Sequence, residues 1–401
     1  MQRKASENMA LSVRVEANLF TAMKATAFST YPGDTLAHVL AARLDRVQPQ
    51  GPRGQWSPVR VIPTTDDDSN QGVDNQRWTL ATDPTIYPNN PEWFDEYVTQ
   101  PIKIISPPYF LHGPGWEADF RRVFSQRSEH YNPIVRYGIM YTEYNPSTSL
   151  NVHIGNSTNP SAGFPFHTIR NLAMLLLVYE PEMDRMVRLH TFPDHQNNPK
   201  RWVTPLQSPH FLPPNVPQTC SPGTLASHVL NTCLDMRSII HAMNPLLPEF
   251  RQPNSHFYFK YDFSSLLDST EEANSITNQP NGHPATPPPV QSGRKTVQFR
   301  LPSNLVVDPE ILIHWVRLLG SLVEFANEVN LNTLMETLGI AVQDNETAPN
   351  QETAIMGARP PEFASLQPPG SLLRLFTAME QAQIPLDSDT ARFWHRRRTR
   401  A

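Results

Sequence analysis

The sequence has few of the features that would assign it to several common protein classes. It contains two cysteines, Cys220 and Cys233, in 401 residues. Two are too few for a disulfide framework, and they lack the spacing of a metal site. They are typical of buried or incidental thiols in a reducing compartment. The longest apolar run, residues 172–179, is far shorter than the roughly 20 residues that span a membrane.

The sequence also shows no targeting segment and no large excess of positive or negative charge. The N-terminus has no long apolar segment behind its basic residues, so we expect no signal peptide and a cytoplasmic protein. Charged residues make up 18% of the chain, and the formal net charge is −5. This balance predicts neither a nucleic acid nor an anionic membrane as partner. The arginines at 396–398 are interpreted as a solvated tail, with a nuclear or anionic-surface contact as the alternative.

Signatures of several reaction classes are missing. The sequence has no Gly-rich phosphate-binding loop, no Walker motif and no G-x-S-x-G. His190 and His195, with Asp194, are interpreted as an incidental loop cluster rather than a metal site. The three aspartates at 66–68 are interpreted as part of a solvated loop.

The chain does have 41 prolines together with 39% hydrophobic residues. This combination predicts a globular body with long, proline-broken loops, and the chain is long enough to bury a substantial core. Residues 268–293 are of low complexity, and we expect them to be disordered.

Hydrophobic periodicity predicts a mixed α+β fold in which two long helices cover one sheet. Pro181 is expected to limit or kink the second helix, and Asp308 and Pro309 are expected to be the N-cap and first-turn residue of the third. The strands are expected at 12–20, 78–83, 102–105, 150–154 and 296–301, and the helices at 34–47, 168–183 and from 308 onward.

In several of these strands, polar residues alternate with apolar ones. If the strands are neighbours, their polar residues line one concave surface, which would be a plausible ligand site. A half-solvated antiparallel sheet shows the same alternation and stays open as the alternative. A single strand histidine such as His153 is more often structural than a ligand. The residues of this surface are Arg14, Glu16, Lys103, Asn151, His153, Gln298 and Arg300.

Six segments resemble, in the correct order, the motifs of the amidoligase-like proteins common in fungi. That family is related to glutamine synthetase and glutamate–cysteine ligase. The resemblance covers about residues 76–330, and SVRVEAN (12–18) more loosely resembles the family's first strand. The six segments are WTLATDPTI (78–86), IKIISPPY (102–109), NPSTSLNVHIG (145–155), TIRNLAMLLLVYEPEMDRM (168–186), KTVQFR (295–300) and VDPEILIHWVRLLGSLVEFA (307–326).

The resemblance implies a glutamine synthetase-like fold, in which a curved antiparallel sheet holds ATP and Mg²⁺ on its concave face. The family reaction couples a carboxylate to an amine through an acyl phosphate, so the implied substrates are a small carboxylate and an amine, or a peptide. We expect residues 76–345 to form the amidoligase-like domain, with the disordered insert at about 268–293. Residues 1–75 would belong to the same domain, and 346–401 would be a peripheral tail.

This chain departs from the family at ligand positions. Lys103 stands at a family glutamate, and Asn151 stands at the first histidine of "H-V-H". Gln298 replaces the glutamate of "E-F-R", and Arg14 replaces the first glutamate of the first strand. The apolar residues of these strands are kept. The resemblance therefore extends to the fold residues and fails at the ligands.

Four positions still match the family. By resemblance, Arg300 and His153 would be catalytic and would bind the nucleotide phosphates, with Lys103 beside them. Glu16 and Asp83 would hold the metal.

A lysine in place of a carboxylate reverses the charge near the metal. Two like unit charges about 4 Å apart repel by roughly 4 kcal/mol at an effective dielectric of 20, and Mg²⁺ carries a double charge. We therefore expect an amidoligase-like protein with severely reduced metal affinity and catalysis. The alternative is a pseudoenzyme whose cationic surface binds a nucleotide without metal, a small carboxylate, an acidic peptide or a protein. That these charges are only tolerated in a site no longer used stays open as well.

Overall fold

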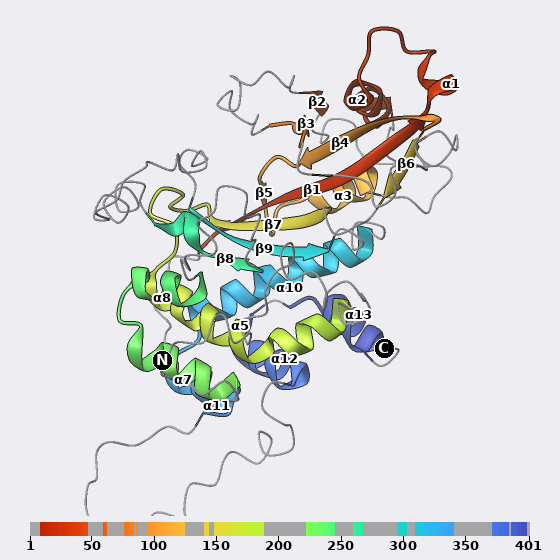
Figure 1. Cartoon of the computed structure of the whole chain (residues 1–401). Coiled ribbons are helices and arrows are strands. Elements are labelled where there is room, and N and C mark those ends of the chain that lie inside the picture. The colour runs from red at the N-terminus through yellow and green to blue at the C-terminus, as the bar shows by residue number, and fades with distance from the viewer. Residues whose placement is uncertain are drawn as a thin grey trace, which may run out of the picture. The chain divides into compact units, whose positions relative to one another are not determined.

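A computed structural model of the chain forms two compact units, each described here by itself (Figure 1). Unit 1 consists of Met1–Gly163, Pro193–Thr204 and Pro248–Val316, and unit 2 of Phe164–Phe192, Pro205–Leu247 and Arg317–Ala401. The structure describes residues 9–46, 59–61, 76–83, 86, 95–124, 140–143, 148–187, 222–244, 260–267, 295–302, 309–340, 371–384 and 386–398.

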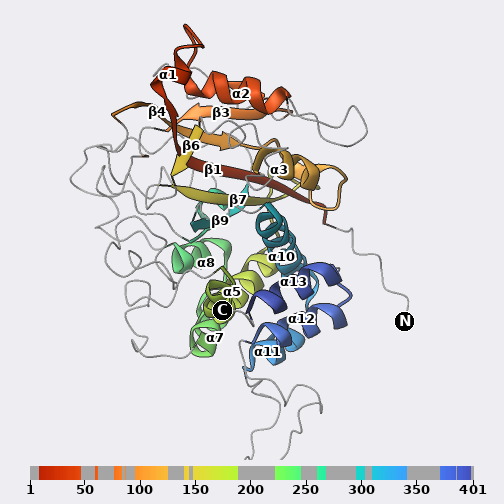
Figure 2. The same ribbon diagram turned by 90° about the vertical axis from the view of Figure 1, so that its right-hand side faces the viewer.

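Unit 1 contains an open, mostly antiparallel sheet, which confirms the predicted mixture of helices with an antiparallel sheet. The strand order is β2-β3-β4-β1-β7-β9-β8, and β5 and β6 also pair with β1. Figures 1 and 2 show β1 in the middle of the sheet, between β4 and β7. The strands are β1 (Leu11–Lys24), β2 (Val59–Val61), β3 (Trp78–Thr82), β4 (Tyr97–Ile105), β5 (Tyr109–Phe110), β6 (Met140–Glu143), β7 (Ser149–Asn156), β8 (Tyr261–Asp262) and β9 (Thr296–Pro302).

The central strand β1 shows why alternation finds only part of a strand. Val13 and Val15 are buried on one face, and Ser12 and Arg14 on the other face are only partly buried, so the first half has the alternation typical of a strand. Phe20 and Ala22 lie on the opposite face, but they are buried as well, because they pack with Ile86 and the partly buried Tyr97. With both faces covered the alternation stops, and the strand continues to Lys24, beyond the predicted end.

Two helices of unit 1 pack on the face of the sheet that carries Val13 and Val15. They are α2 (Leu36–Arg46) and α3 (Trp116–Phe124). The backbone N–H of Ala37 in α2 donates to Gln100 of β4 over 3.0 Å. The ring of Phe120 in α3 lies edge-on to Trp78 of β3, with centroids 5.8 Å apart. Unit 1 also contains the short helix α1 (Ala25–Phe28) and the 3₁₀ turn η4 (Ser264–Leu266).

A buried polar cluster ties α3 to the sheet. Asp119 is 1% exposed, and its carboxylate accepts from Trp78 Nε1 over 2.9 Å, from Arg122 Nε over 2.8 Å and from the Tyr109 hydroxyl. Arg122 also donates to the Leu44 carbonyl of α2 over 3.2 Å. We call Trp78, Tyr109, Asp119 and Arg122 the Asp119 cluster.

Unit 2 is built from helices. The N-terminal helix α5 is joined to the end of α10 and to α11 by long-range hydrogen bonds. Asn171 Nδ2 donates to the Ala326 carbonyl over 2.9 Å, and the Tyr179 hydroxyl donates to the Thr337 carbonyl over 3.2 Å. The helices are α5 (Phe166–Val187), α7 (Pro222–Thr232), α8 (Met236–Met243), α10 (Pro309–Glu328), which has its residues from Arg317 in unit 2, α11 (Leu331–Leu338), α12 (Leu372–Gln381) and α13 (Ser388–Arg398).

Helix α5 does not stop at Pro181 but continues to Val187. A proline removes one backbone donor, and here the following turn still buries Met183 and Met186, which offsets that loss. Helix α10 begins at Pro309 as predicted. Among the described residues, no helix combines the length and apolarity needed to cross a bilayer.

Several predictions lie outside the described residues: the Asp308 cap, the 268–293 insert, the aspartates at 66–68 and the cluster at His190, Asp194 and His195. The prediction that two long helices cover the sheet concerns both units, because the sheet lies in unit 1 and the helices lie largely in unit 2. It stays a prediction, as do the domain boundaries. Within the predicted C-terminal tail, α12 and α13 are formed, and Trp394 of α13 is fully buried.

Candidate functional site

The strand register brings the predicted polar residues together on one face of the unit 1 sheet. Residues directly opposite each other on neighbouring strands point to the same face. Glu16 lies opposite Asn151, and Asn151 lies opposite Arg300, which gives one row across β1, β7 and β9. Lys103 of β4 lies opposite Asn18, one row further along β1.

A second row runs parallel to the first, two residues away. Arg14 lies opposite His153, His153 opposite Gln298, and Gln298 opposite Asp262 of β8. We call these two rows, with Lys103, the polar face. Its residues are Arg14, Glu16, Lys103, Asn151, His153, Asp262, Gln298 and Arg300.

Glu16 is the buried centre of this face. Its side chain is 4% exposed, and Lys103 Nζ lies 3.0 Å from its Oε2 atom. The other carboxylate oxygen, Oε1, lies 3.7 Å from Arg14 Nη2 and 3.6 Å from His153 Nε2. One carboxylate therefore faces two fixed cations and a histidine.

These neighbours decide the ionisation of Glu16. Burial by itself raises the pKa of a carboxyl group. Lys103, His153 and Arg14 act in the opposite direction and together outweigh burial, so the pKa of Glu16 lies well below its ordinary value. Glu16 is thus a carboxylate at neutral pH.

Arg300 has its own carboxylate. Its Nη2 atom lies 3.5 Å from Asp262 Oδ2 and donates to Gln298 Oε1 over 3.4 Å. The other Asp262 oxygen, Oδ1, accepts from both the backbone N–H and the hydroxyl of Ser264. Asp262 is therefore fixed by η4 while it faces Arg300.

The polar face is less exposed than a solvated sheet surface. The side chains of Arg14, Lys103, His153 and Arg300 are between 15% and 25% exposed. Charged side chains on an open sheet face normally extend into water. The half-solvated sheet considered from sequence therefore fits poorly around Glu16.

Some buried atoms of the face have no hydrogen-bond partner within the described part of the chain. They include Glu16 Oε1 and His153 Nε2, which face each other at 3.6 Å, and Asn151 Oδ1. Asn151 is 5% exposed, and a buried amide oxygen without a donor costs about 1–3 kcal/mol. Such atoms are expected where a ligand or a bound water completes the hydrogen bonding.

Asp83 is not brought to this cluster. It follows β3, and its backbone N–H donates to the carbonyl of Pro101, which lies opposite Phe20. Phe20 is four residues from Glu16 along β1, or about 13 Å at the usual strand rise. The role of Asp83 as a metal ligand stays a prediction that this placement does not support.

The polar face does not fit a divalent metal. Hard cations need several oxygen ligands with negative charge, and the buried carboxylate here already neutralises Lys103. Among the described residues, no group of three or more histidine, cysteine, aspartate or glutamate side chains gathers where it could hold a metal ion. The described part of the polar face therefore lacks the ligand set that a divalent metal needs.

Asp262 is the residue of the face that the sequence analysis missed. It belongs to a strand of only two described residues beside the low-complexity segment. The sequence pattern that could have indicated it is the stretch FYFKYDF (257–263), in which aromatic residues alternate with charged ones from Phe259 to Phe263.

Comparisons of the chain with protein-family models, with curated proteins and with solved structures give no match.

Proposed function

We propose that this chain is an amidoligase-like protein that has lost the metal-dependent coupling reaction and uses the polar face to bind a small anion. Support for the family comes from motif order and from the sheet register. The strands that carry the motif-like segments, β4, β1, β7 and β9, are consecutive neighbours. A glutamine synthetase-like sheet with its site on one face is compatible with that order.

The observation that carries the proposal is the contact between Lys103 and Glu16. The ammonium lies 3.0 Å from the carboxylate and already neutralises the negative charge that a bound cation would need. A divalent ion about 4 Å from this ammonium would be repelled by roughly 8 kcal/mol at an effective dielectric of 20. Displacing Lys103 would instead leave its charge without its nearest carboxylate.

Loss of the metal has a direct consequence for the family reaction. Formation of an acyl phosphate concentrates negative charge on the transferred phosphoryl group, which divalent ions normally neutralise. The polar face supplies fixed cations but no set of carboxylates to hold such ions. We therefore propose binding without phosphoryl transfer.

The charge balance of the face favours an anion. Three fixed cations, Arg14, Lys103 and Arg300, stand against two carboxylates, Glu16 and Asp262, which leaves one excess positive charge before His153 is counted. Guanidinium groups bind carboxylates and phosphates through paired hydrogen bonds. A small carboxylate or phosphate fits this face, and we propose no nucleic acid or membrane as partner.

The test is to remove the internal cation. In Lys103→Glu, two carboxylates would face Asn151 and His153, and we expect Mg²⁺ or Mn²⁺ to raise the melting temperature of the variant but not of the wild type. Lys24→Glu is the matched control, because Lys24 is exposed at the end of β1. Lys103→Gln, which removes the charge without adding a carboxylate, should show no metal response.

Two outcomes would contradict the proposal. A wild-type protein that is already stabilised by Mg²⁺ at millimolar concentration would mean that Lys103 does not exclude the metal. Magnesium-dependent consumption of ATP by the wild type would favour an active amidoligase instead.

A further inference from the structure

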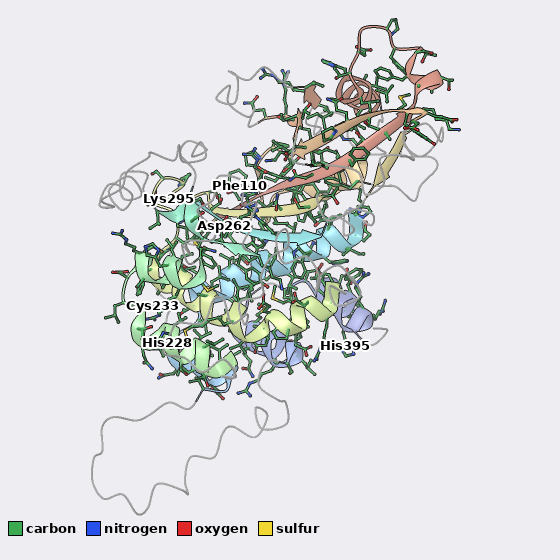
Figure 3. All side chains as sticks on the ribbon, viewed as in Figure 1. Phe110, His228, Cys233, Asp262, Lys295 and His395 are labelled. Carbon is green, nitrogen blue, oxygen red and sulfur yellow. The ribbon has the colours of Figure 1, made fainter. Side chains whose placement is uncertain are left out.

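Phe110 is a large apolar side chain placed at the edge of the polar face. It is 65% exposed, and it lies opposite Ser12 in the pairing of β5 with β1. The preceding residue, Tyr109, turns to the other face, where its ring packs edge-on to Phe120 with centroids 5.8 Å apart. Because successive side chains of a strand alternate, Phe110 points to the same face as Arg14. Figure 3 labels Phe110 together with Asp262 and Lys295.

The residues beside Phe110 are small. The register continues from Phe110 to Ser12, Gly155 and Thr296, which form a third row next to that of Arg14. A Cβ atom added to Gly155 would lie 3.0 Å from Ser12 Oγ and 3.1 Å from Thr296 Cγ2. The side chains of Ser12 and Thr296 therefore already fill the space above Gly155, and the row beside the Phe110 ring carries only short side chains.

The separation between this row of short side chains and the cations suits a small molecule. Arg14 is two residues from Ser12, about 7 Å along the strand, and Phe110 is about 5 Å to the side of Ser12. An anion held between Arg14 and His153 would therefore place an attached ring over the short side chain of Ser12, against Phe110.

A single exposed phenylalanine is ordinary on a protein surface, but the polar face also contains a buried acceptor without a donor. Asn151, 5% exposed, lies in the row beyond Arg14 with an Oδ1 atom that lacks a hydrogen-bond donor in the described part of the chain. A ligand that reaches this atom with an O–H group would supply the missing donor.

We propose that the anion bound by the polar face is an aromatic hydroxy acid: its carboxylate contacts the cations, its hydroxyl donates to Asn151, and its ring packs on Phe110. This inference rests on the proposed anion-binding function and specifies its ligand class. Phe110 is then a specificity-determining residue of the same site.

Calorimetric titration of the full chain with 3-phenyllactate, 3-phenylpropionate and lactate tests the inference. We expect 3-phenyllactate to bind most tightly. Removal of the ring, in lactate, should weaken binding about 3- to 10-fold, as expected for an aromatic contact. In Phe110→Ala this difference should disappear, and Phe110→Trp should preserve or enlarge it. Leu373→Ala, another exposed apolar residue at 44% exposure, should behave like the wild type.

The outcomes separate the two proposals. Equal binding of lactate and 3-phenyllactate by the wild type would overturn the inference about Phe110 and leave anion binding intact. Equal binding of 3-phenyllactate and 3-phenylpropionate would overturn the role of Asn151. If none of these acids binds and inorganic phosphate also fails to bind, the proposed function falls together with the inference.

Discussion

The two faces of the unit 1 sheet each bury a carboxylate next to cations, but they satisfy it differently. Asp119, on the face covered by α2 and α3, accepts hydrogen bonds from Trp78, Tyr109 and Arg122. Glu16, on the polar face, has one close ion pair with Lys103 and two contacts of 3.6 Å and 3.7 Å. A fully satisfied buried network holds a fold together, whereas a partly satisfied one leaves atoms for something else to bind.

The comparison assigns the two clusters different roles. The Asp119 cluster joins β3, β5 and α3 through contacts that leave its carboxylate no capacity for a ligand. The polar face keeps a buried acceptor without a hydrogen-bond donor at Asn151 Oδ1, within the described part of the chain. We therefore expect mutations of the first cluster to lower stability, and mutations of the second to change binding more than stability.

The largest effect is expected from Asp119→Ala. This change leaves the buried guanidinium of Arg122, 3% exposed, without its carboxylate, so the free energy of unfolding should fall by about 3–5 kcal/mol. Urea denaturation followed by circular dichroism measures this loss. Asp34→Ala, at an exposed position, is the control. A loss below 1 kcal/mol would mean that the Asp119 cluster does not hold α3 on the sheet.

A smaller loss, with a characteristic pH dependence, is expected from Glu16→Gln. Because the pKa of Glu16 in the folded protein lies well below the ordinary 4.5, its ionised form stabilises the protein above about pH 4.5. That contribution is lost as the pH falls through the folded pKa. We expect Glu16→Gln to be less stable than the wild type at pH 7, with the difference shrinking in acid.

Urea titrations of both proteins between pH 7 and pH 3 test this expectation. A stability difference that stays constant, or grows, as the pH falls would contradict the assignment of Glu16 as a carboxylate held by its cations.

The smallest effect on stability is expected from Asp262→Asn. The asparagine keeps an acceptor for Ser264 but removes the charge that faces Arg300, whose ion pair is 3.5 Å long and about 15% exposed. We expect stability to change by less than about 1 kcal/mol, while phosphate or carboxylate binding tightens a few-fold because the excess positive charge rises. Calorimetry should show this gain; weaker anion binding would argue that Asp262 positions Arg300 for the ligand.

The polar face could be predicted from the sequence because the pattern that indicates it lies within single strands. Arg14 and Glu16, like Asn151 and His153, are two residues apart on a strand, so alternation alone assigns each pair to one face. To predict that these pairs form rows across the sheet, it was enough to assume that the strands are neighbours. In the second half of β1 both faces are buried, so the alternation of polar and apolar residues is absent after Phe20.

The Asp119 cluster and Asp262 could not be predicted from a local pattern. Trp78 and Asp119 are 41 residues apart in the chain, and nothing in the sequence around either residue indicates that they meet. Asp262 lies on a strand too short for a repeating pattern. The ion pairs of Glu16 were missed for a related reason: the sequence placed Lys103 on the face but not at the carboxylate.

The central claim is that the polar face binds an anion without a divalent metal. Isothermal titration of the protein with ATP, in the presence and absence of excess Mg²⁺, tests it most directly. We predict that ATP binds no more tightly with Mg²⁺ than without it, because Lys103 already occupies the carboxylate of Glu16. Binding that appears or tightens markedly only with Mg²⁺ would contradict it.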